Sequence, residues 1–355
     1  MISKFSKAFS SENIATGYLY FYVHFVTEIC CFFALARVTG NAIVLWMTPL
    51  IYDFAAFVPQ SVIGYFCDKH PKFKPGIIGT IVLSLGMLSF YVVSVPYIPI
   101  VIVCIGNALL HVAGAEVTLR TSKGKLSHSA IFVGGGSFGI IIGRLLGAMN
   151  IPMYVVAIAA FTMIPFILLA DTYEKEEYLS SYNYASDKVS PVTVLLLATF
   201  IVIVRGYMAY GIPTGWNKTT IQAVYLFFIM GIGKCLGGIL CDAIGMKKTI
   251  YISMLTAVPF LIFGDRLMVV SLIGVMFFSM TMPITLGLLT SILKKAPGLA
   301  FGFTTIGLFL GTLPTFFYRI KSVWVNCIII VVCTIVCFVA ALYITQKNGE
   351  GVKYE

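Results

Sequence analysis

Residues 64–74 read Gly64-Tyr-Phe-Cys-Asp68-Lys-His-Pro-Lys-Phe-Lys, and residues 238–248 read Gly238-Ile-Leu-Cys-Asp242-Ala-Ile-Gly-Met-Lys-Lys. The two segments are 174 residues apart, which is close to half of the 355-residue chain. Each segment lies between two long apolar runs. They therefore mark equivalent points in two halves, and we infer that the chain is a tandem duplication.

The composition indicates that a lipid bilayer surrounds most of the chain. Hydrophobic residues make up 59% of it, charged residues only 11%, and the mean hydropathy is +0.97, well outside the usage of soluble domains. Apolar runs of roughly 20 residues cross a bilayer as helices, because unpaired backbone groups are costly in lipid. The twelve expected spans lie near residues 15–36, 41–66, 76–95, 97–119, 127–149, 151–170, 191–211, 217–241, 248–263, 267–291, 298–318 and 322–345.

Six spans fall in each half. The predicted all-α membrane protein has an N-terminal six-helix bundle (1–170), a cytosolic linker (171–190) and a C-terminal six-helix bundle (191–355). The 174-residue offset also aligns residues 119–124 with 293–298, each a short basic turn between the fourth and fifth spans. Repeats of this kind enclose a substrate site at their interface near the bilayer midplane, so a central cavity is expected.

Cationic residues predict the orientation. With the N-terminus in the cytosol, sixteen Lys and Arg residues occupy the cytosolic side, and the outer side holds five: Arg37, Lys218, Arg266, Arg319 and Lys321. Because cytosolic loops carry the excess of Lys and Arg, both termini are predicted to be cytosolic. The net charge of +10 then faces anionic lipid head groups, and nucleic acid is not an expected partner.

The repeated segment resembles the Gly-x-x-x-Asp-x-x-Gly-x-Lys-Lys signature of the major facilitator superfamily, whose members are secondary transporters with six plus six helices. The matching positions are Gly64, Asp68, Lys72, Gly238, Asp242, Gly245, Lys247 and Lys248, whereas Pro71 replaces the second glycine of the first copy. Glycine near the membrane boundary lets a neighbouring helix approach, and a carboxylate at a helix end can pair with basic residues or with a helix N-terminus. We interpret these positions as a cytosolic gate motif.

The fifth span contains a glycine ladder. Residues 139–148 read Gly139-Ile-Ile-Ile-Gly143-Arg144-Leu-Leu-Gly147-Ala. This segment resembles the antiporter motif Gly-x-x-x-Gly-Pro-x-x-Gly-Gly, with Arg144 in place of proline. Together with Gly135, glycine recurs at every fourth residue, which favours tight helix packing.

Within the superfamily, the chain is similar to fosmidomycin-resistance-type exporters. Their His-x-x-x-Asp pattern in span one reads His24-Phe-Val-Thr-Glu28 here, and their span-four pattern Gly-x-Ala-x-x-His-Pro-Glu-Gly reads Gly106-Asn-Ala-Leu-Leu-His111-Val-Ala-Gly. Valine and alanine replace the Pro-Glu pair of that pattern. The resemblance therefore implies an exporter but does not carry over its substrate.

Ionisable residues inside a span cost roughly 2.5 to 3.5 kcal/mol on insertion, so each needs a function or a partner. His24 and Glu28 are four residues apart and share a helix face. A carboxylate beside an imidazole, which titrates near neutrality, is typical of proton coupling, and the alternative is a hydrogen bond that fixes span one. Asp53 shares a face with Gln60 and Gly64 that should meet the opposite half, either as a proton carrier or as an ion-pair partner.

Five residues are candidates for substrate binding: Arg205, His111, Asn107, Arg144 and Lys234. Arg205 lies near the middle of span seven, where it would anchor a phosphonate, phosphate or carboxylate, or pair with Glu28 or Asp53. Asn107 and His111 are one helical turn apart on span four and would contact substrate or only pack. Lys234 is the repeat equivalent of Gln60 and would anchor substrate or form a gate ion pair. Arg144 would bind substrate or extend to the head groups.

These patterns predict a proton-coupled secondary transporter in a bacterial-like plasma membrane. We expect a monomer that exports a small organic solute, anionic or drug-like, and needs no cofactor beyond the transmembrane proton gradient. An uptake symporter for a small anion or sugar, and a non-transporting receptor with the same fold, are the alternatives. No metal site and no enzyme activity are predicted, because the nine cysteines are scattered and His24, His111 and His128 share no ligand-type spacing.

Overall fold

The computed structural model describes residues 14–39, 47–149 and 151–346. The N-terminal half contains α2 (Ala15–Thr39), α3 (Met47–Phe57), α4 (Pro59–Lys69), α5 (Pro75–Ser89), α6 (Tyr97–Thr121), α7 (Ser127–Gly147), α8 (Met153–Ala160) and α9 (Met163–Ala170). The C-terminal half contains α10 (Pro191–Gly211), α11 (Thr220–Ile244), α12 (Met246–Ile250), the π-helical turn η2 (Tyr251–Leu255), α13 (Thr256–Phe263), α14 (Met268–Ser279), α15 (Thr281–Ile292), α16 (Pro297–Phe317) and α17 (Val323–Ile344).

The all-helical membrane fold is confirmed. The described residues contain eleven helical segments that are long and apolar enough to cross a membrane, together with the shorter apolar helix Pro75–Ser89. These segments coincide with the twelve predicted spans, except for residues 41–46 of the second, which lie outside the described ranges. The prediction was wrong about the end of the third span, since α5 stops at Ser89 and turns lead to Pro96.

Several spans are interrupted rather than continuous. The second span breaks between α3 and α4 at Pro59, because proline has no backbone N–H to continue the helical hydrogen bonds. The ninth span contains the π-helical turn η2, and the tenth divides at Met280 between α14 and α15. Breaks of this kind are invisible to a hydropathy window because the residues around them remain apolar.

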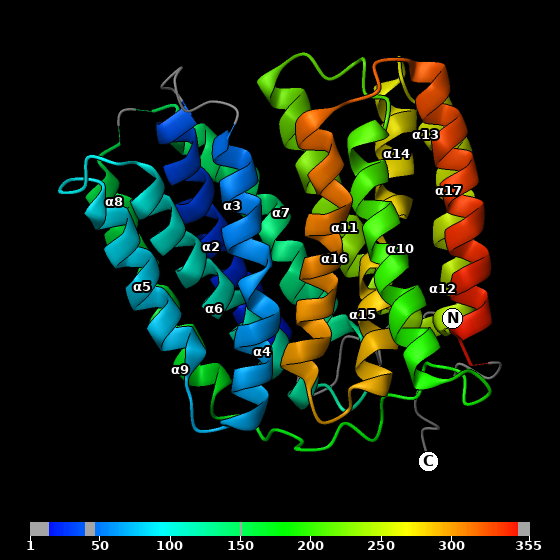
Figure 1. Cartoon of the computed structure of the whole chain (residues 1–355), viewed down its shortest axis with the longest axis horizontal. Coiled ribbons are helices and arrows are strands. Elements are labelled where there is room, and N and C mark those ends of the chain that lie inside the picture. Colours follow the sequence, from blue (N-terminus) through cyan, green and yellow to red (C-terminus); the bar gives the residue numbers. More distant parts are fainter. Residues whose placement is uncertain (1–13, 40–46, 150, 347–355) are drawn as a thin grey trace.

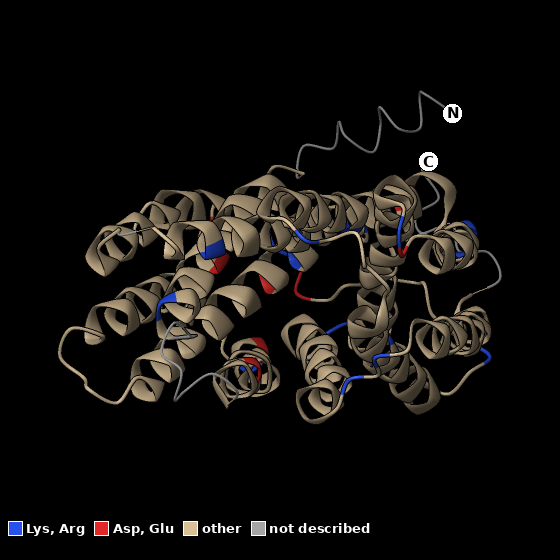
Figure 2. Ribbon diagram, turned by 90° about the horizontal axis from the view of Figure 1, so that it is seen from above, with Lys and Arg blue, Asp and Glu red and all other residues tan. Residues whose placement is uncertain are grey.

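The two halves stand side by side, with α2 to α9 on one side and α10 to α17 on the other (Figure 1). They meet mainly along two pairs of helices, α4 with α16 and α7 with α11, and α16 also contacts α3 and α6. Most of the helical ribbon is free of charged residues (Figure 2).

The glycine ladder packs α7 against α2 within the N-terminal half, where a Cβ on Gly143 would lie 2.6 Å from the Ile29 carbonyl oxygen.

The segment between α9 and α10 runs across one end of both halves (Figure 1). Tyr182 and Tyr184 of this linker are buried. Their hydroxyls bond Ser122 at 2.7 Å and the Gly124 carbonyl at 2.6 Å, on the loop between α6 and α7. The Tyr184 amide donates to Ser291 of α15 at 3.0 Å, so the linker is fastened to both halves. We call this end of the molecule the gate end, because it also holds Asp68 and Asp242.

The orientation of the gate end toward the cytosol stays a prediction. Four of the cationic residues on which it rests, Lys4, Lys7, Lys347 and Lys353, lie outside the described residues.

Candidate functional site

Two histidines and a glutamate converge in the middle of the N-terminal half. His24 and Glu28 come from α2, and His111 comes from α6. The Glu28 Oε1 atom lies 3.6 Å from His24 Nε2 and 3.3 Å from His111 Nε2. The two imidazole rings are edge to face, with centroids 4.3 Å apart. We call these three residues the His–Glu–His cluster; each of them is 6 to 7% exposed.

Backbone carbonyls fix how the two imidazoles are oriented. His24 Nδ1 lies 2.9 Å from the Phe132 carbonyl oxygen, and His111 Nδ1 lies 3.0 Å from the Asn107 carbonyl oxygen. A carbonyl oxygen only accepts hydrogen bonds, so each Nδ1 must be the donor. In the neutral ring the Nε2 lone pair then faces Glu28. Three acceptors therefore surround one point, and a cation at that point, either a proton or a metal ion, would satisfy all three.

Aromatic rings cover the cluster on the side of the gate end. Phe132, on the second turn of α7, lies 4.9 Å from the His24 ring between centroids. Phe301, on α16 of the other half, is stacked at 6.4 Å from His111 and lies 6.1 Å from Phe132. Because α16 belongs to the opposite half, a movement between the halves would carry Phe301 off the cluster.

Asn107 lies one turn from His111 and contacts two other residues. Its amide nitrogen donates to the Tyr52 hydroxyl and to Cys31 Sγ, both at 3.2 Å. Its buried oxygen has no hydrogen-bond partner among the described residues. The predicted pair of Asn107 and His111 thus exists, but His111 is engaged with Glu28.

Lys234 is a candidate substrate-binding cation on α11, in the half opposite the cluster. Within the described part of the chain, no carboxylate lies within ion-pair distance of Lys234. A half-buried lysine without a carboxylate partner suits a bound anion.

Arg205 lies elsewhere than the predicted position in the centre. Its Nη2 donates to the Phe278 carbonyl at 3.0 Å, and its guanidinium lies 4.8 Å from the Phe278 ring centroid. It borders a small void together with residues of α13, α15 and α17, inside the C-terminal half. The structure therefore does not bring Arg205 to Glu28 or Asp53, because its long side chain is held by the carbonyl at the break between α14 and α15.

Asp53 and Arg144 belong to the N-terminal half, and each contacts the C-terminal half outside the cluster. Asp53 on α3 lies beside Thr312 of α16. The guanidinium of Arg144 lies 5.1 Å from the Phe32 ring on α2 and 5.2 Å from the Phe227 ring on α11. The face of the second span that carries Asp53 thus meets the opposite half as expected, and Arg144 forms an aromatic contact between the halves.

The first copy of the gate motif joins α4 to α16. The Asp68 carboxylate accepts hydrogen bonds from the amides of Gly298 at 3.1 Å and Leu299 at 2.9 Å, in the first turn of α16. Gly64 lies one turn earlier, and a Cβ there would collide with the backbone of Gly298. A carboxylate at a helix N-terminus satisfies unpaired N–H groups and the helix dipole at once.

The second copy repeats this arrangement with the halves exchanged. The Asp242 carboxylate at the end of α11 accepts from the amides of Leu126 at 2.8 Å and Ser127 at 2.9 Å, at the start of α7. A Cβ on Gly238 would lie 2.6 Å from the Leu126 carbonyl oxygen. Each half thus caps the fifth span of the other, and two equivalent contacts close the gate end.

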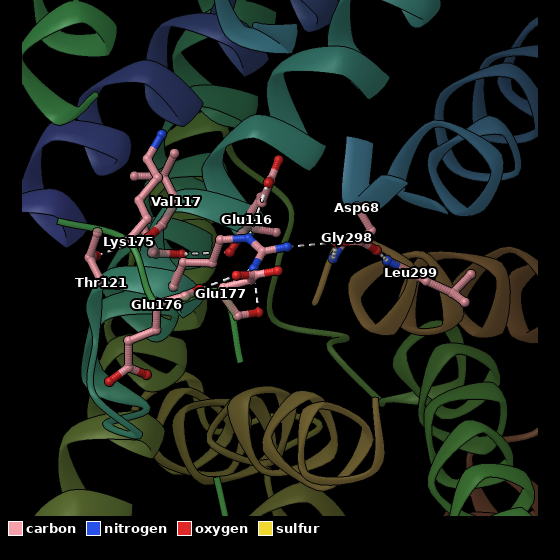
Figure 3. A network of polar contacts seen from close by, with 12 residues as sticks. Asp68, Glu116, Val117, Thr121, Lys175, Glu176, Glu177, Gly298 and Leu299 are labelled. Atoms are coloured by element: carbon pink, nitrogen blue, oxygen red, sulfur yellow. Dashed lines mark hydrogen bonds and ion pairs between the residues drawn. The ribbon is translucent and has the colours of Figure 1, made fainter. Parts of the chain in front are cut away.

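Arg120 links the first gate contact to the linker. Its guanidinium lies 3.4 Å from Asp68 and 3.1 Å from Glu116, and it donates to the carbonyls of Glu176 and Glu177 at 3.1 and 3.0 Å. Figure 3 shows Asp68 beside the first turn of α16, with the glutamates on the far side of the network. The network borders a cavity of about 1370 Å³. The Arg120 Nε–H donates to the Glu116 carboxylate one turn earlier on α6.

The remaining gate positions are structural or exposed. Gly245 lies between α11 and α12 with φ of +90°, in the left-handed region that favours glycine, whereas the first copy has Pro71 at the equivalent position. Lys72 and Lys248 are exposed and Lys247 is half-buried. This exposure is compatible with lipid head groups as partners.

Two parts of the site were not found from the sequence. The aromatic cover of Phe132 and Phe301 has no local signature, because phenylalanine is common in every span. The linker was predicted only as a cytosolic connection, although its tyrosines at 182 and 184 were a visible signal for burial. The argument that the histidines are too dispersed for a metal site was also wrong, since the fold brings His24, His111 and Glu28 together.

Solved structures with the same architecture cover almost the whole chain. The Escherichia coli fucose:proton symporter matches with a TM-score of 0.64 and 13% identity, over 94% of this chain and 99% of that one. A second structure of it, a major facilitator superfamily transporter in the outward conformation, has a TM-score of 0.56 at 15% identity, over 91% and 99%. The chain has the major facilitator fold. The human organic anion transporter TETRAN matches with a TM-score of 0.63 and 12% identity, over 94% and 100%.

A sequence relative is the fosmidomycin resistance protein of Escherichia coli strain K12. It is 23% identical over 250 residues, and the match spans 60% of this chain and 60% of that protein. No protein-family model matches the chain. The solved structures named above are those of transporters, one of them a symporter, and not of enzymes.

Proposed function

We propose that this protein is a proton-coupled secondary transporter that moves a small organic, anionic or drug-like solute across the plasma membrane by alternating access. The observation that carries the proposal is the His–Glu–His cluster, where three buried acceptors face one another and can share a proton. Its partner is Lys234, a cation on the opposite half with no carboxylate beside it. A proton site in one half and an anion site in the other suit coupled transport.

The gate contacts define one end state of the cycle. With Asp68 and Asp242 on the helix N-termini of the opposite halves, the gate end is closed and Phe301 covers the cluster. Opening the gate end separates α4 from α16 and α7 from α11, which uncovers the cluster from that side. Protonation and solute binding would then both shift the equilibrium of this opening movement.

Export is favoured by the sequence likeness to a protein named for fosmidomycin resistance. In export by exchange, donor groups of the solute bind Glu28 and the imidazoles in place of the proton. Binding of the solute then releases protons, because both compete for the same acceptors.

Proton-coupled uptake is the second candidate, because the opposite charges of Glu28 and Lys234, one in each half, attract each other. A proton on Glu28 removes that attraction and leaves the Lys234 ammonium free for an anion. Proton and anion then bind cooperatively, and anion binding takes up protons.

Reconstituted liposomes test the proposal. A small phosphonate or carboxylate should accumulate against its gradient when a pH gradient is imposed, and Glu28→Gln should abolish the dependence on the pH gradient while exchange of unlabelled for labelled solute continues. Transport by Glu28→Gln that still responds fully to the pH gradient would disprove coupling at the cluster. Proton release on solute binding indicates exchange, whereas proton uptake indicates symport.

A further inference from the structure

The spacing within the His–Glu–His cluster is that of metal ligands rather than of hydrogen-bonded pairs. Charge-assisted hydrogen bonds between nitrogen and carboxylate oxygen are about 2.7 to 2.9 Å long. The two contacts of Glu28 Oε1 are 3.6 and 3.3 Å. In a tetrahedral site with metal–ligand distances of about 2.0 to 2.2 Å, the ligand atoms lie roughly 3.4 Å from one another. The separations from the carboxylate oxygen to both nitrogens therefore equal two edges of a coordination tetrahedron.

The donor set has the right chemistry for the same ion. Two imidazole nitrogens and one carboxylate oxygen all lie within 4.8 Å of one another, and the three residues are buried. Two histidines with one glutamate form a ligand set that binds Zn²⁺ and leaves a fourth position open. No positively charged side chain lies within ion-pair distance of Glu28 among the described residues, so the carboxylate is free to compensate a bound cation.

The surrounding shell holds both rings in the ligating tautomer. His24 Nδ1–H donates to the Phe132 carbonyl and His111 Nδ1–H donates to the Asn107 carbonyl. Histidines that bind metals almost always donate their second ring N–H in this way, because the bond fixes the ring and makes its other nitrogen more basic. Gly136 completes the shell, since any Cβ at that position would collide with His24 Nε2.

We propose that His24, Glu28 and His111 form a binding site for a divalent transition-metal ion of the Zn²⁺ type within the N-terminal half. All three ligands come from α2 and α6, so the metal does not bridge the two halves. A bound ion takes both Nε2 lone pairs and the Glu28 charge, and it therefore occupies the cluster in place of any other cation. The proposal does not rest on the proposed function, because a protein that transports nothing could still bind the ion.

Zinc binding by the full-length protein, purified in detergent, tests the site. In competition with a chromophoric chelator, the wild-type protein should bind Zn²⁺ at one site of high affinity. His24→Gln and His111→Gln should each weaken that affinity at least about 100-fold, the upper end of what loss of an outer-shell partner costs. The matched controls are His70→Gln, in an exposed loop, and Cys31→Ser, a thiol close to the cluster; both should bind Zn²⁺ like the wild type.

X-ray absorption on the zinc-loaded wild-type protein adds a readout that no folding defect of a variant can disturb. Nitrogen and oxygen ligands at about 2.0 to 2.1 Å, without sulfur, are expected. Sulfur at about 2.3 Å would place the ion on cysteines and overturn the assignment. Absence of stoichiometric binding, unchanged affinity in both histidine variants, or an equal loss in His70→Gln would overturn it as well.

Discussion

Replacing Asp242 by asparagine should open the gate end. The carboxylate accepts two backbone N–H bonds at 2.8 and 2.9 Å from the start of α7, and asparagine retains one acceptor oxygen without charge. A hydrogen bond to a charged group contributes about 1.5 to 3 kcal/mol, and the helix dipole adds up to about 1 kcal/mol. The closed state should therefore lose about 2 to 4 kcal/mol relative to the open state. This corresponds to a shift of roughly 30- to 900-fold in the equilibrium between them.

Distances between spin labels across the gate end measure this shift. Labels attached through unnatural amino acids at Lys72 and Lys248, which are exposed on opposite halves, leave the nine native cysteines in place. The distance distribution should move toward longer values in Asp242→Asn and in Asp68→Asn, and further in the double variant, because the two contacts involve separate helix pairs. Asp171→Asn is the control, since its ion pairs with Lys74 and Lys175 join the linker to the N-terminal half alone.

Two results would refute this reasoning. One is a distance distribution that is the same in both gate variants and in the wild type, measured under conditions where the wild type already samples the open state. The other is an equal shift in Asp171→Asn, which would show that any loss of acidic charge at this end opens the gate.

Three further predictions follow from named contacts. Gly64→Ala should lower the melting temperature, because its Cβ collides with the Gly298 backbone and an overpacked contact costs about 1 to 3 kcal/mol, whereas Gly211→Ala, with its nearest neighbour 3.4 Å away on Asn326, should not. Tyr184→Phe should make the linker more sensitive to proteolysis, because it leaves the Gly124 carbonyl without its hydroxyl donor, at a cost of about 1 to 3 kcal/mol. Tyr178→Phe should have no effect on proteolysis, because Tyr178 is half exposed. Lys234→Gln should raise the KM for an anionic solute without lowering the melting temperature. Arg205→Gln should lower the melting temperature, because it loses the hydrogen bond to the Phe278 carbonyl. The opposite pattern would indicate that Arg205 binds the substrate.

The fold was predictable because its determinants are local or repeated. Hydropathy located the spans, since every lipid-facing turn must be apolar, and the gate motif appeared twice at one offset. The partners of Asp68 and Asp242 were predictable only as a class, a helix N-terminus or a basic residue. Which helix supplies the amides depends on how the halves dock, and no local pattern carries that information.

The site was predictable where one helix suffices and unpredictable where two must meet. His24 and Glu28 share a face of α2, so their pairing follows from the helical period. The contact of Glu28 with His111 spans two helices that are distant in sequence and was not foreseen. The position of the Arg205 side chain was unpredictable for a related reason, since its contact with the Phe278 carbonyl joins two helices that are distant in sequence.

The His–Glu–His cluster is proposed to couple a proton to solute movement. A pH-sensitive dye enclosed in proteoliposomes, followed while a small phosphonate is added outside, tests it most directly. The internal pH should change only when the solute is present. This change should persist in His70→Gln and be absent in Glu28→Gln, although Glu28→Gln still exchanges solute. Solute flux without any proton movement in the wild type, or an unchanged proton signal in Glu28→Gln, would contradict it.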